Sequence, residues 1–337
     1  MKISIIIPVY NIKDYVQECI LSVMNQSYTQ SLECVIVNDC SDDGSLQVVE
    51  SLLIGYKGNI SFKVISLNKN RGLSAARNEG VRNCTGEYVY FLDGDDYLDK
   101  NCIQVFTNVL LHHEYDMIIA DYKTFGAKQV YPQLLLNEGE YKGNDILAEY
   151  TKGNFYMMAW NKLIKKEFLL KNDIQFEEGL IHEDDLWSFL IANHLESMHV
   201  ISKITYYYRC HEQSIMTKSP IPGRHMRAYV TIIEKMMNFF VTNQNRYNHM
   251  FIFVGMVVTL QGAINHELPD MFDTAWHKFR DQYNKMKLKD RMKYALCLKN
   301  KRISQASLVN ISYILPSSIG LCFAKLVVKI RSIIKHR

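Results

Sequence analysis

The sequence lacks the short motifs that identify several common classes of protein. It has neither a GxxxxGK[ST] loop nor a GxGxxG turn, which disfavours a P-loop nucleotidase and a dinucleotide-dependent dehydrogenase. Its eight cysteines form no CxxC pair and no zinc-ligand spacing, so they are expected to be small buried thiols in a reducing compartment. The apolar run at the N-terminus is too short for a signal peptide.

Net charge is small but unevenly distributed. The 337 residues carry only +4 in total, which gives no indication of a general nucleic-acid binder. Residues 278–337 hold 15 Lys and Arg against 2 Asp and Glu, which leaves 24 against 33 in the first 277 residues. An acidic body with a basic tail predicts an acidic partner for the tail.

Apolar strands and amphipathic helices alternate over the first 120 residues. Ile3–Val9 is a continuous apolar run, as expected of a strand buried on both faces, and residues 13–25 have helical spacing. The alternation continues with predicted strands at 33–37, 62–66, 88–92 and 117–120, and predicted helices at 44–53, 74–83 and 101–112. Such βα units predict an α/β fold with a mostly parallel sheet and helices on both faces.

Polar residues follow four of the predicted strands. They include Asn11, Asp39, Arg71 and the pair Asp93 and Asp95. The carboxyl ends of parallel strands meet at one edge of the sheet, and open α/β sheets bind ligands there. One acidic loop is usually a helix cap, but four polar loops on one rim predict a site.

Asp93 and Asp95 are the candidate metal ligands. Residues two positions apart in an extended chain point the same way, so both carboxylates can face one cation. Hard oxygen ligands suit Mg²⁺ or Mn²⁺, ions that commonly bind diphosphate as well. The alternative is a turn in which Asp96 or Asp99 caps the next helix. The position after a buried strand, on a polar rim, favours the cation site.

Other polar groups fit a structural or a functional role. Asp39 suits either a helix cap or a hydrogen bond from a nucleobase N–H. Arg71 opens a helix and suits phosphate, whereas Arg77 taken alone is expected on a solvated face. Residues 183–185 suit the first turn of a helix, or offer a general base. His211 is either structural or a metal ligand.

The alternation weakens beyond residue 125. Residues 206–211 look like a strand and its exit, residues 220–223 look like a linker, and residues 225–300 look all-helical. The predicted organisation is an α/β domain at 1–219 with halves at 1–120 and 121–219, a helical region at 220–302 and a tail at 303–337.

The tail has an amphipathic pattern. Residues 303–324 carry no charge but contain too many polar residues to predict a membrane span. One helical stripe is apolar and another is basic; they contain Ile319, Phe323, Leu326, Ile330 and Ile333, and Lys325, Lys329, Ser332 and His336. This pattern, with the basic stretch 285–302, predicts a helix that lies on an anionic membrane. The alternative is a helix packed on the protein with a solvated basic edge.

Five motifs, in their order and spacing, resemble those of glycosyltransferase family 2. They are Pro8-Val9-Tyr10-Asn11, Val37-Asn38-Asp39-Cys40-Ser41-Asp42-Asp43-Gly44-Ser45, Asn70-Arg71-Gly72-Leu73-Ser74-Ala75-Ala76-Arg77-Asn78, Phe91-Leu92-Asp93-Gly94-Asp95-Asp96 and His182-Glu183-Asp184-Asp185. The resemblance covers roughly residues 1–215. It implies a GT-A fold, a nucleotide-sugar donor, inversion at the anomeric carbon, and a bacterial role in capsule, exopolysaccharide or teichoic-type glycans.

The resemblance also implies roles for residues at the matching positions. On the donor side, the base is held by Pro8, Tyr10 and Asp39, and the nucleotide pocket is lined by Asn11 and Arg71. Departures from the family pattern are Asn38 in place of an acid, Cys40 where Gly is common, and Gly94 where Ser is more frequent.

The remaining implied roles concern the metal and the acceptor. Asp95 is the direct ligand of Mn²⁺ or Mg²⁺, Asp93 contacts the ribose or the metal, and His211 matches a position that contacts the metal or the diphosphate. Asp184 matches the catalytic base, with Glu183 beside it on the acceptor side. The sugar pocket is walled by the segment of Trp160 and Lys162.

Together these features predict an inverting, metal-dependent glycosyltransferase. It would move a sugar from a UDP-hexose or UDP-N-acetylhexosamine to a hydroxyl of a growing, lipid-linked surface glycan, at the cytoplasmic face of the plasma membrane. One alternative is a nucleotidyltransferase, which would carry a basic Gly-rich loop near the N-terminus. Another is a catalytically inactive sugar-binding scaffold held by the tail, against which intact Asp95 and Asp184 argue. The sequence does not determine the sugar, the acceptor, the linkage or the oligomeric state.

Overall fold

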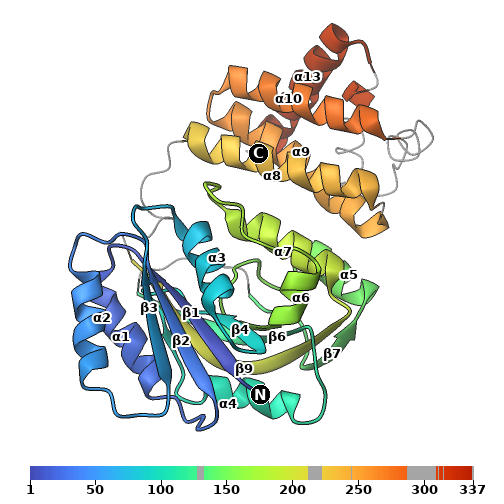
Figure 1. Cartoon of the computed structure of the whole chain (residues 1–337). Coiled ribbons are helices and arrows are strands. Elements are labelled where there is room, and N and C mark those ends of the chain that lie inside the picture. The colour runs from blue at the N-terminus through green and yellow to red at the C-terminus, as the bar shows by residue number, and fades with distance from the viewer. Residues whose placement is uncertain are drawn as a thin grey trace. The chain divides into compact units, whose positions relative to one another are not determined.

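The chain forms two compact units, Met1–Lys218 and Ser219–Arg337. The structure, a computed structural model, describes residues 1–126, 133–211, 222–243, 245–286, 309, 311–313 and 315–335 (Figure 1). The boundary predicted near residue 220, much of the basic stretch 285–302 and the start of the predicted tail lie outside the described residues.

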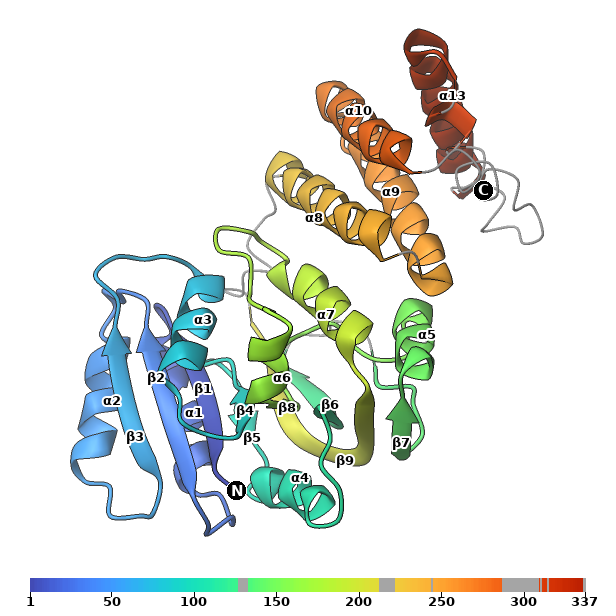
Figure 2. The same ribbon diagram turned by 45° about the vertical axis from the view of Figure 1, so that its right-hand side comes forward.

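The first half of the N-terminal unit is the predicted run of βα units. Its strands are β1 (Ile3–Val9), β2 (Leu32–Asn38), β3 (Ser61–Ser66) and β4 (Tyr88–Phe91), and its helices are α1 (Lys13–Met24), α2 (Ser45–Ile54) and α3 (Leu73–Asn83). All three pairings in the order β3-β2-β1-β4 are parallel. Helices α1 and α2 pack together on one face and α3 covers the other (Figure 2). The fully buried strands β1 and β2 explain the continuous apolar runs.

The second half of the unit extends the same sheet but mixes strand directions. Its elements are β5 (Tyr97–Leu98), α4 (Cys102–Leu110), β6 (Met117–Gly126), β7 (Gly139–Lys142), α5 (Asn144–Lys152), β8 (Lys162–Lys165), α6 (Lys166–Lys171), α7 (Glu183–His194) and β9 (Ser197–Cys210). Strand β8 lies antiparallel between β4 and β6, and β6 pairs parallel with β9. Strands β5 and β7 pair antiparallel with β9. The nine-stranded sheet confirms the expected fold class; its purely parallel part ends at β4, and beyond it both strand directions occur.

An aromatic stack fills the core behind β8 and β9. The ring centroids of Trp160 and Tyr206 lie 4.6 Å apart at an interplanar angle of 9°, and those of Trp160 and Tyr156 lie 5.1 Å apart. All three side chains are fully buried. Stacked rings of this size add to the stability from area burial, so they fix the segment that enters β8.

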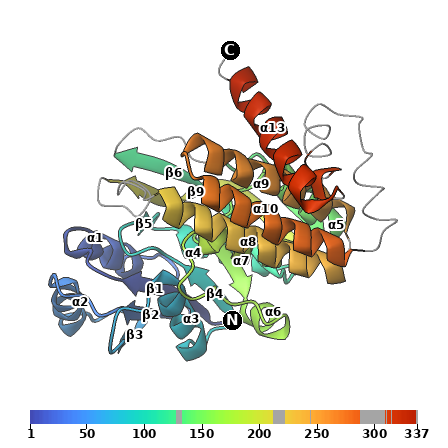
Figure 3. The ribbon, with the colours of Figure 1, turned by 90° about the horizontal axis from the view of Figure 1, so that it is seen from above.

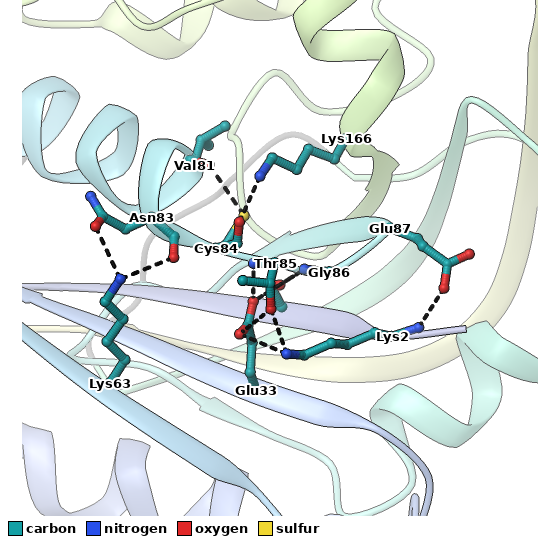
Figure 4. Close-up of polar contacts among 11 residues, drawn as sticks. Lys2, Glu33, Lys63, Val81, Asn83, Cys84, Thr85, Gly86, Glu87 and Lys166 are labelled. Atoms are coloured by element: carbon teal, nitrogen blue, oxygen red, sulfur yellow. Dashed lines mark hydrogen bonds and ion pairs between the residues drawn. The ribbon is translucent and has the colours of Figure 1, made fainter.

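The buried carboxylate of Glu33 links neighbouring segments at the amino-terminal ends of the parallel strands (Figure 4). Glu33 is 7% exposed and accepts hydrogen bonds from the hydroxyls of Ser4 and Thr85 and from the amides of Thr85 and Gly86. Lys2 Nζ lies 3.1 Å from its Oε2. Burial opposes ionisation of Glu33, but the hydrogen bonds prevail and lower its pKa to about 2.

The C-terminal unit is helical throughout its described residues. It contains α8 (Pro222–Thr242), α9 (Arg246–Asn265), α10 (Pro269–Lys285) and α13 (Ser317–Lys335); the first three pack against one another (Figure 3). The linker predicted at 220–223 is wrong in its second half, because Pro222 and Gly223 begin α8. Proline is favoured in the first turn of a helix, where its missing N–H costs nothing.

Helix α13 packs within this unit through its small residues. Gly320, Ala324 and Val328 are buried, and a Cβ on Gly320 would lie 2.1 Å from the Ser312 carbonyl oxygen. Two residues of the predicted apolar stripe, Ile319 and Leu326, point away from this contact, since they are 58% and 57% exposed. Among the described residues, no helix is both long and apolar enough to cross a membrane.

Candidate active site at the carboxyl rim of the sheet

Asp39 connects the loop after β2 to the loop after β3. It follows β2 and is 2% exposed. Its carboxylate accepts hydrogen bonds from the amides of Arg71 and Gly72, both at 2.7 Å. Gly72 has φ +87°, a conformation that a residue with a Cβ rarely adopts. A carboxylate has about four acceptor positions, so these bonds leave Asp39 capacity for the predicted hydrogen bond from a nucleobase.

The loops after β1 and β2 are joined by Asn11. Its side-chain amide donates to Asp42 Oδ1 at 2.8 Å, and its oxygen accepts from the Asp42 amide at 3.0 Å. Pro8 is buried within β1, and Tyr10 beyond its end is 47% exposed. Cys40 has φ +63°, which explains why a glycine would suit this turn. The loop accommodates cysteine there.

Asp93 and Asp95 have different partners after β4. Asp93 Oδ1 lies 2.7 Å from Arg77 Nη2, and Asp95 Oδ2 lies 2.9 Å from His211 Nε2. Gly94 between them packs on β1: a Cβ there would lie 2.4 Å from Ile12 Cδ1 and 2.8 Å from the Pro8 carbonyl oxygen. The loop therefore requires glycine at this position.

The alternative in which Asp96 caps the next helix does not hold. Asp96 is 1% exposed and accepts hydrogen bonds from the Tyr206 hydroxyl at 2.6 Å and the Arg209 amide at 2.7 Å. Burial raises its pKa well above the ordinary value, and the carboxylates of Asp95 and Asp93 add to the shift. Asp96 therefore holds the end of β9 against the loop Asp93–Asp96, and this places His211 near Asp95.

The expectation of a solvated Arg77 is wrong as well. Its side chain is 1% exposed. Nη1 lies 2.9 Å from both Glu183 Oε1 and Asp184 Oδ1, while Nη2 binds Asp93. The acids of the first turn of α7 are thus paired with a buried cation from α3, in addition to any effect of the helix dipole.

The acids at the start of α7 lie in a poorly solvated setting. Burial raises the pKa of Glu183, with a further contribution from Asp184 that Arg77 opposes. Burial and Asp184 also raise the pKa of Asp185 to about 7. Asp184 Oδ2 accepts a hydrogen bond from the Ala159 amide at 3.2 Å. The Asp184 carboxylate is therefore held at both oxygens.

The segment before β8 lies beside Asp184. Trp160 is 1% exposed within the aromatic stack, so its ring supports this segment from the core. Lys162 is equally buried; its Nζ donates to the Met158 carbonyl and lies 4.1 Å from the centroid of the Tyr156 ring. Burial lowers the pKa of Lys162 to about 7, although Asp184 opposes the shift.

The contacts connect most of the predicted site residues. Arg77 joins Asp93 to Glu183 and Asp184, and the Arg71 side chain pairs with Glu178 at 2.8 Å. Loops from the two predicted halves, 1–120 and 121–219, therefore meet at one rim. Sequence reasoning missed Arg77 and Asp96, because each needs partners from distant segments. Both residues stand in one of the five motifs, but a motif does not show which distant side chains they bind.

The donor atoms suit a divalent cation only in part. Within the described ranges, no group of three or more His, Cys, Asp or Glu residues could hold a metal ion. Asp95 and His211 offer one carboxylate and one imidazole 2.9 Å apart, and both are ligands that Mn²⁺ accepts. Ions of this kind usually complete their shell with water and substrate phosphates, so the pair fits a cation bound together with a diphosphate.

The fold and this rim define an α/β protein with an acidic site at the carboxyl ends of its strands. Residues 4–171 match the family model described as glycosyl transferase family 2. The chain is 30% identical over 238 residues to poly(ribitol-phosphate) beta-N-acetylglucosaminyltransferase TarS of Staphylococcus aureus, covering 68% of this chain and 38% of TarS. It is 26% identical over 230 residues to glycosyltransferase GlyA of Streptococcus pneumoniae, covering 64% and 31%. The chain belongs to glycosyltransferase family 2.

A solved structure shares the architecture. The structure of S. aureus TarS 1–349 in complex with UDP-GlcNAc is similar with a TM-score of 0.72 at 22% identity, covering 98% of this chain and 91% of that one. At this identity the likeness shows the GT-A fold. The chain spans about a third of the length of TarS and GlyA.

Proposed function

We propose that this chain is an inverting glycosyltransferase that moves a sugar from a UDP-linked donor to an acceptor hydroxyl. The observation that carries the proposal is the buried Arg77, which binds Asp93 on the donor side and Glu183 and Asp184 on the acceptor side. Support also comes from TarS, a beta-N-acetylglucosaminyltransferase whose similar structure holds UDP-GlcNAc. We therefore place UDP-N-acetylhexosamine before UDP-hexose among candidate donors.

The nucleotide would lie across the ends of β1 to β3. The exposed Tyr10 ring offers a face for the base, beside the buried Pro8. Asp39 would accept from the base N–H, and Asn11 and Arg71 would line the pocket. The Arg71 side chain is exposed and pairs with Glu178 near the surface, so it would turn toward a phosphate by exchanging this partner.

Asp95 and His211 would hold Mn²⁺ or Mg²⁺, with Asp93 at the ribose or the metal. The bound cation would supply Lewis-acid stabilisation for the diphosphate as it departs. Arg209 supports this corner: its Nε donates to the Asp95 carbonyl at 2.9 Å and its amide donates to Asp96. The protein thus fixes the acidic loop from both its side chains and its backbone.

Asp184 would act as the general base. The acceptor hydroxyl attacks the anomeric carbon in line with the leaving diphosphate, and its proton passes to the Asp184 carboxylate, which contributes about 10²–10⁴-fold. A single displacement inverts the configuration, whereas retention through a covalent intermediate would need a second, nucleophilic carboxylate. Glu183 would face the acceptor side, and the segment of Trp160 and Lys162 would wall the sugar pocket.

The acceptor would be a lipid-linked or oligosaccharide chain at the cytoplasmic face of the membrane. Helix α13 supports this part of the proposal, because Ile319, Cys322 and Leu326 are exposed beside the exposed Lys329. An exposed apolar stripe with a basic edge suits an anionic membrane surface. This arrangement corresponds to peripheral binding and does not require a membrane span.

The test is release of UDP from a panel of UDP-GlcNAc, UDP-GalNAc, UDP-glucose and UDP-galactose, with and without EDTA. We expect release from one donor, loss of activity with EDTA and recovery with Mn²⁺. A nucleotidyltransferase would instead release or incorporate pyrophosphate from a nucleoside triphosphate. An inactive sugar-binding scaffold would bind a donor without consuming it, and either result would overturn the proposal.

A further inference from the structure

Arg77 is the one cation that three carboxylates of the candidate site share in the part of the chain that the structure describes. It lies in the second turn of α3. Its partners come from the loop after β4 and from the first turn of α7, at 2.7, 2.9 and 2.9 Å. The contacts divide by nitrogen: Nη2 binds Asp93, and Nη1 binds Glu183 and Asp184. One planar group therefore spans the donor side and the acceptor side.

The orientation of this guanidinium is fixed by packing. Its carbon Cζ lies 5.2 Å from the centroid of the Phe176 ring. Phe176 stacks on Trp187 of α7 with centroids 4.7 Å apart and planes 8° apart. The backbone of Phe176 is held by Asn78, through hydrogen bonds of 2.8 and 2.9 Å. A residue next to Arg77 in α3 thus supports the ring on which Arg77 rests.

Electrostatics keep the group charged. Burial opposes the charge, but Asp184, Asp93 and Glu183 outweigh it and raise the pKa of Arg77 above its ordinary value. A buried charge without partners is costly, so Arg77 and the three acids stabilise one arrangement of the loops. A lysine could keep the charge, but it lacks the planar fork that binds separate carboxylates at fixed angles.

We propose that Arg77 is a positioning residue that fixes the Asp184 carboxylate relative to the donor-side Asp93. This inference rests on the proposed function, in which Asp184 is the base. Arg77 holds Oδ1 and the Ala159 amide holds Oδ2, so the carboxylate plane is set before an acceptor arrives. In this proposal Arg77 acts through Asp184 and would contact neither the donor nor the acceptor. A misplacement of about 1 Å costs about 10²-fold in rate.

The test compares Arg77→Lys with Glu33→Gln, which removes a buried charge at the opposite rim of the sheet. We expect both variants to lower thermal stability. For Arg77→Lys we expect kcat for UDP release from the donor that the wild type uses to fall about 10²-fold, with the KM for that donor changed less than about threefold. For Glu33→Gln we expect both parameters to stay at their wild-type values. A wild-type kcat in folded Arg77→Lys would overturn the inference.

A double variant separates positioning from general destabilisation. If Arg77 acts through Asp184, then Arg77→Lys in an Asp184→Asn background lowers kcat no further than Asp184→Asn alone. Independent, multiplicative losses would overturn the inference while leaving Asp184 as the base. Wild-type turnover in Asp184→Asn would instead overturn the proposed function.

A crystal structure of Arg77→Lys provides a readout that does not depend on turnover. We expect the Asp184 carboxyl group to move by more than about 0.5 Å, the tolerance of a productive site. If the carboxyl group keeps its wild-type position, the positioning role is contradicted. This readout applies even if the protein releases UDP from none of the four sugars, because it does not depend on activity.

Discussion

Replacement of Glu33 by Gln removes a buried charge at the amino-terminal rim while keeping the size of the side chain. The carboxylate accepts bonds from Ser4, Thr85 and Gly86 and pairs with Lys2 (Figure 4). The neutral side-chain amide of Gln carries no charge. Its NH₂ group would also face hydroxyl and amide groups that themselves donate hydrogen bonds to Glu33. We therefore expect the variant to be less stable and to keep its activity, because the site lies at the other ends of the strands.

The magnitude follows from the lowered pKa. A change from 4.5 in the unfolded chain to about 2 in the folded protein corresponds to a ceiling of about 3 kcal/mol at neutral pH. Lys2 is partly exposed, and water screens its share of the interaction. We therefore expect the free energy of unfolding to fall by about 1.5–2.5 kcal/mol at pH 7.

The sign of the pH dependence is determined by the same shift. A carboxylate with a depressed folded pKa stabilises the protein above its unfolded pKa, and this stability is lost as the pH falls through the folded value. The difference between wild type and Glu33→Gln should therefore be complete above about pH 5 and shrink between pH 4.5 and 2. Urea denaturation at several pH values, over the range in which the protein stays folded, measures it.

The matched control is Glu87→Gln on the same rim. Glu87 accepts from the Lys2 amide at 2.9 Å, but its side chain is 63% exposed, so we expect a change below about 0.5 kcal/mol. A stability difference for Glu33→Gln that stays constant down to pH 3 would refute the reasoning, since the charge would then not be its source.

Three further predictions concern the site and α13. Asp184→Asn should keep donor affinity, measured by calorimetry with UDP, and lose about 10²–10⁴-fold in kcat; wild-type turnover removes it from the base role. Gly94→Ala should weaken binding of UDP with Mn²⁺, because its Cβ would meet the Pro8 carbonyl oxygen at 2.8 Å; unchanged affinity would show that the loop can shift. Ile319→Ser with Leu326→Ser should reduce sedimentation with phosphatidylglycerol vesicles while the melting temperature stays unchanged, since both side chains are exposed; undiminished sedimentation speaks against membrane docking by α13.

The first half of the fold could be predicted closely from local pattern. The run Ile3–Val9 is strand β1 with the predicted bounds, and the later elements up to α4 differ by one or two residues at their ends, whereas the strand predicted at 117–120 extends to Gly126 in β6. Beyond β4 the pattern is weaker. Strand β8 has only four residues and pairs antiparallel on both sides, a pairing that no local periodicity encodes.

The candidate site divides in a similar way. The polar loops after β1, β2 and β4 could be located from the sequence, because parallel strands bring their carboxyl ends to one rim. The partners within the rim could not. Asp96 anchors β9 through Tyr206 and Arg209. These partners lie more than a hundred positions away in the sequence, so the residues next to Asp96 do not indicate them.

The amino-acid sequence by itself determined the order of the βα units, the acidic rim and the family, since periodicity and motif spacing are properties of neighbouring residues. Only the tertiary structure decided that Arg77 is buried among Asp93, Glu183 and Asp184 and that Ile319 and Leu326 of α13 are exposed rather than packed in their own unit. The physical reason is that burial and ion pairing depend on which distant segments meet. From its neighbours in the sequence Arg77 is expected on the solvated face of a helix, and its burial follows only from partners in distant segments.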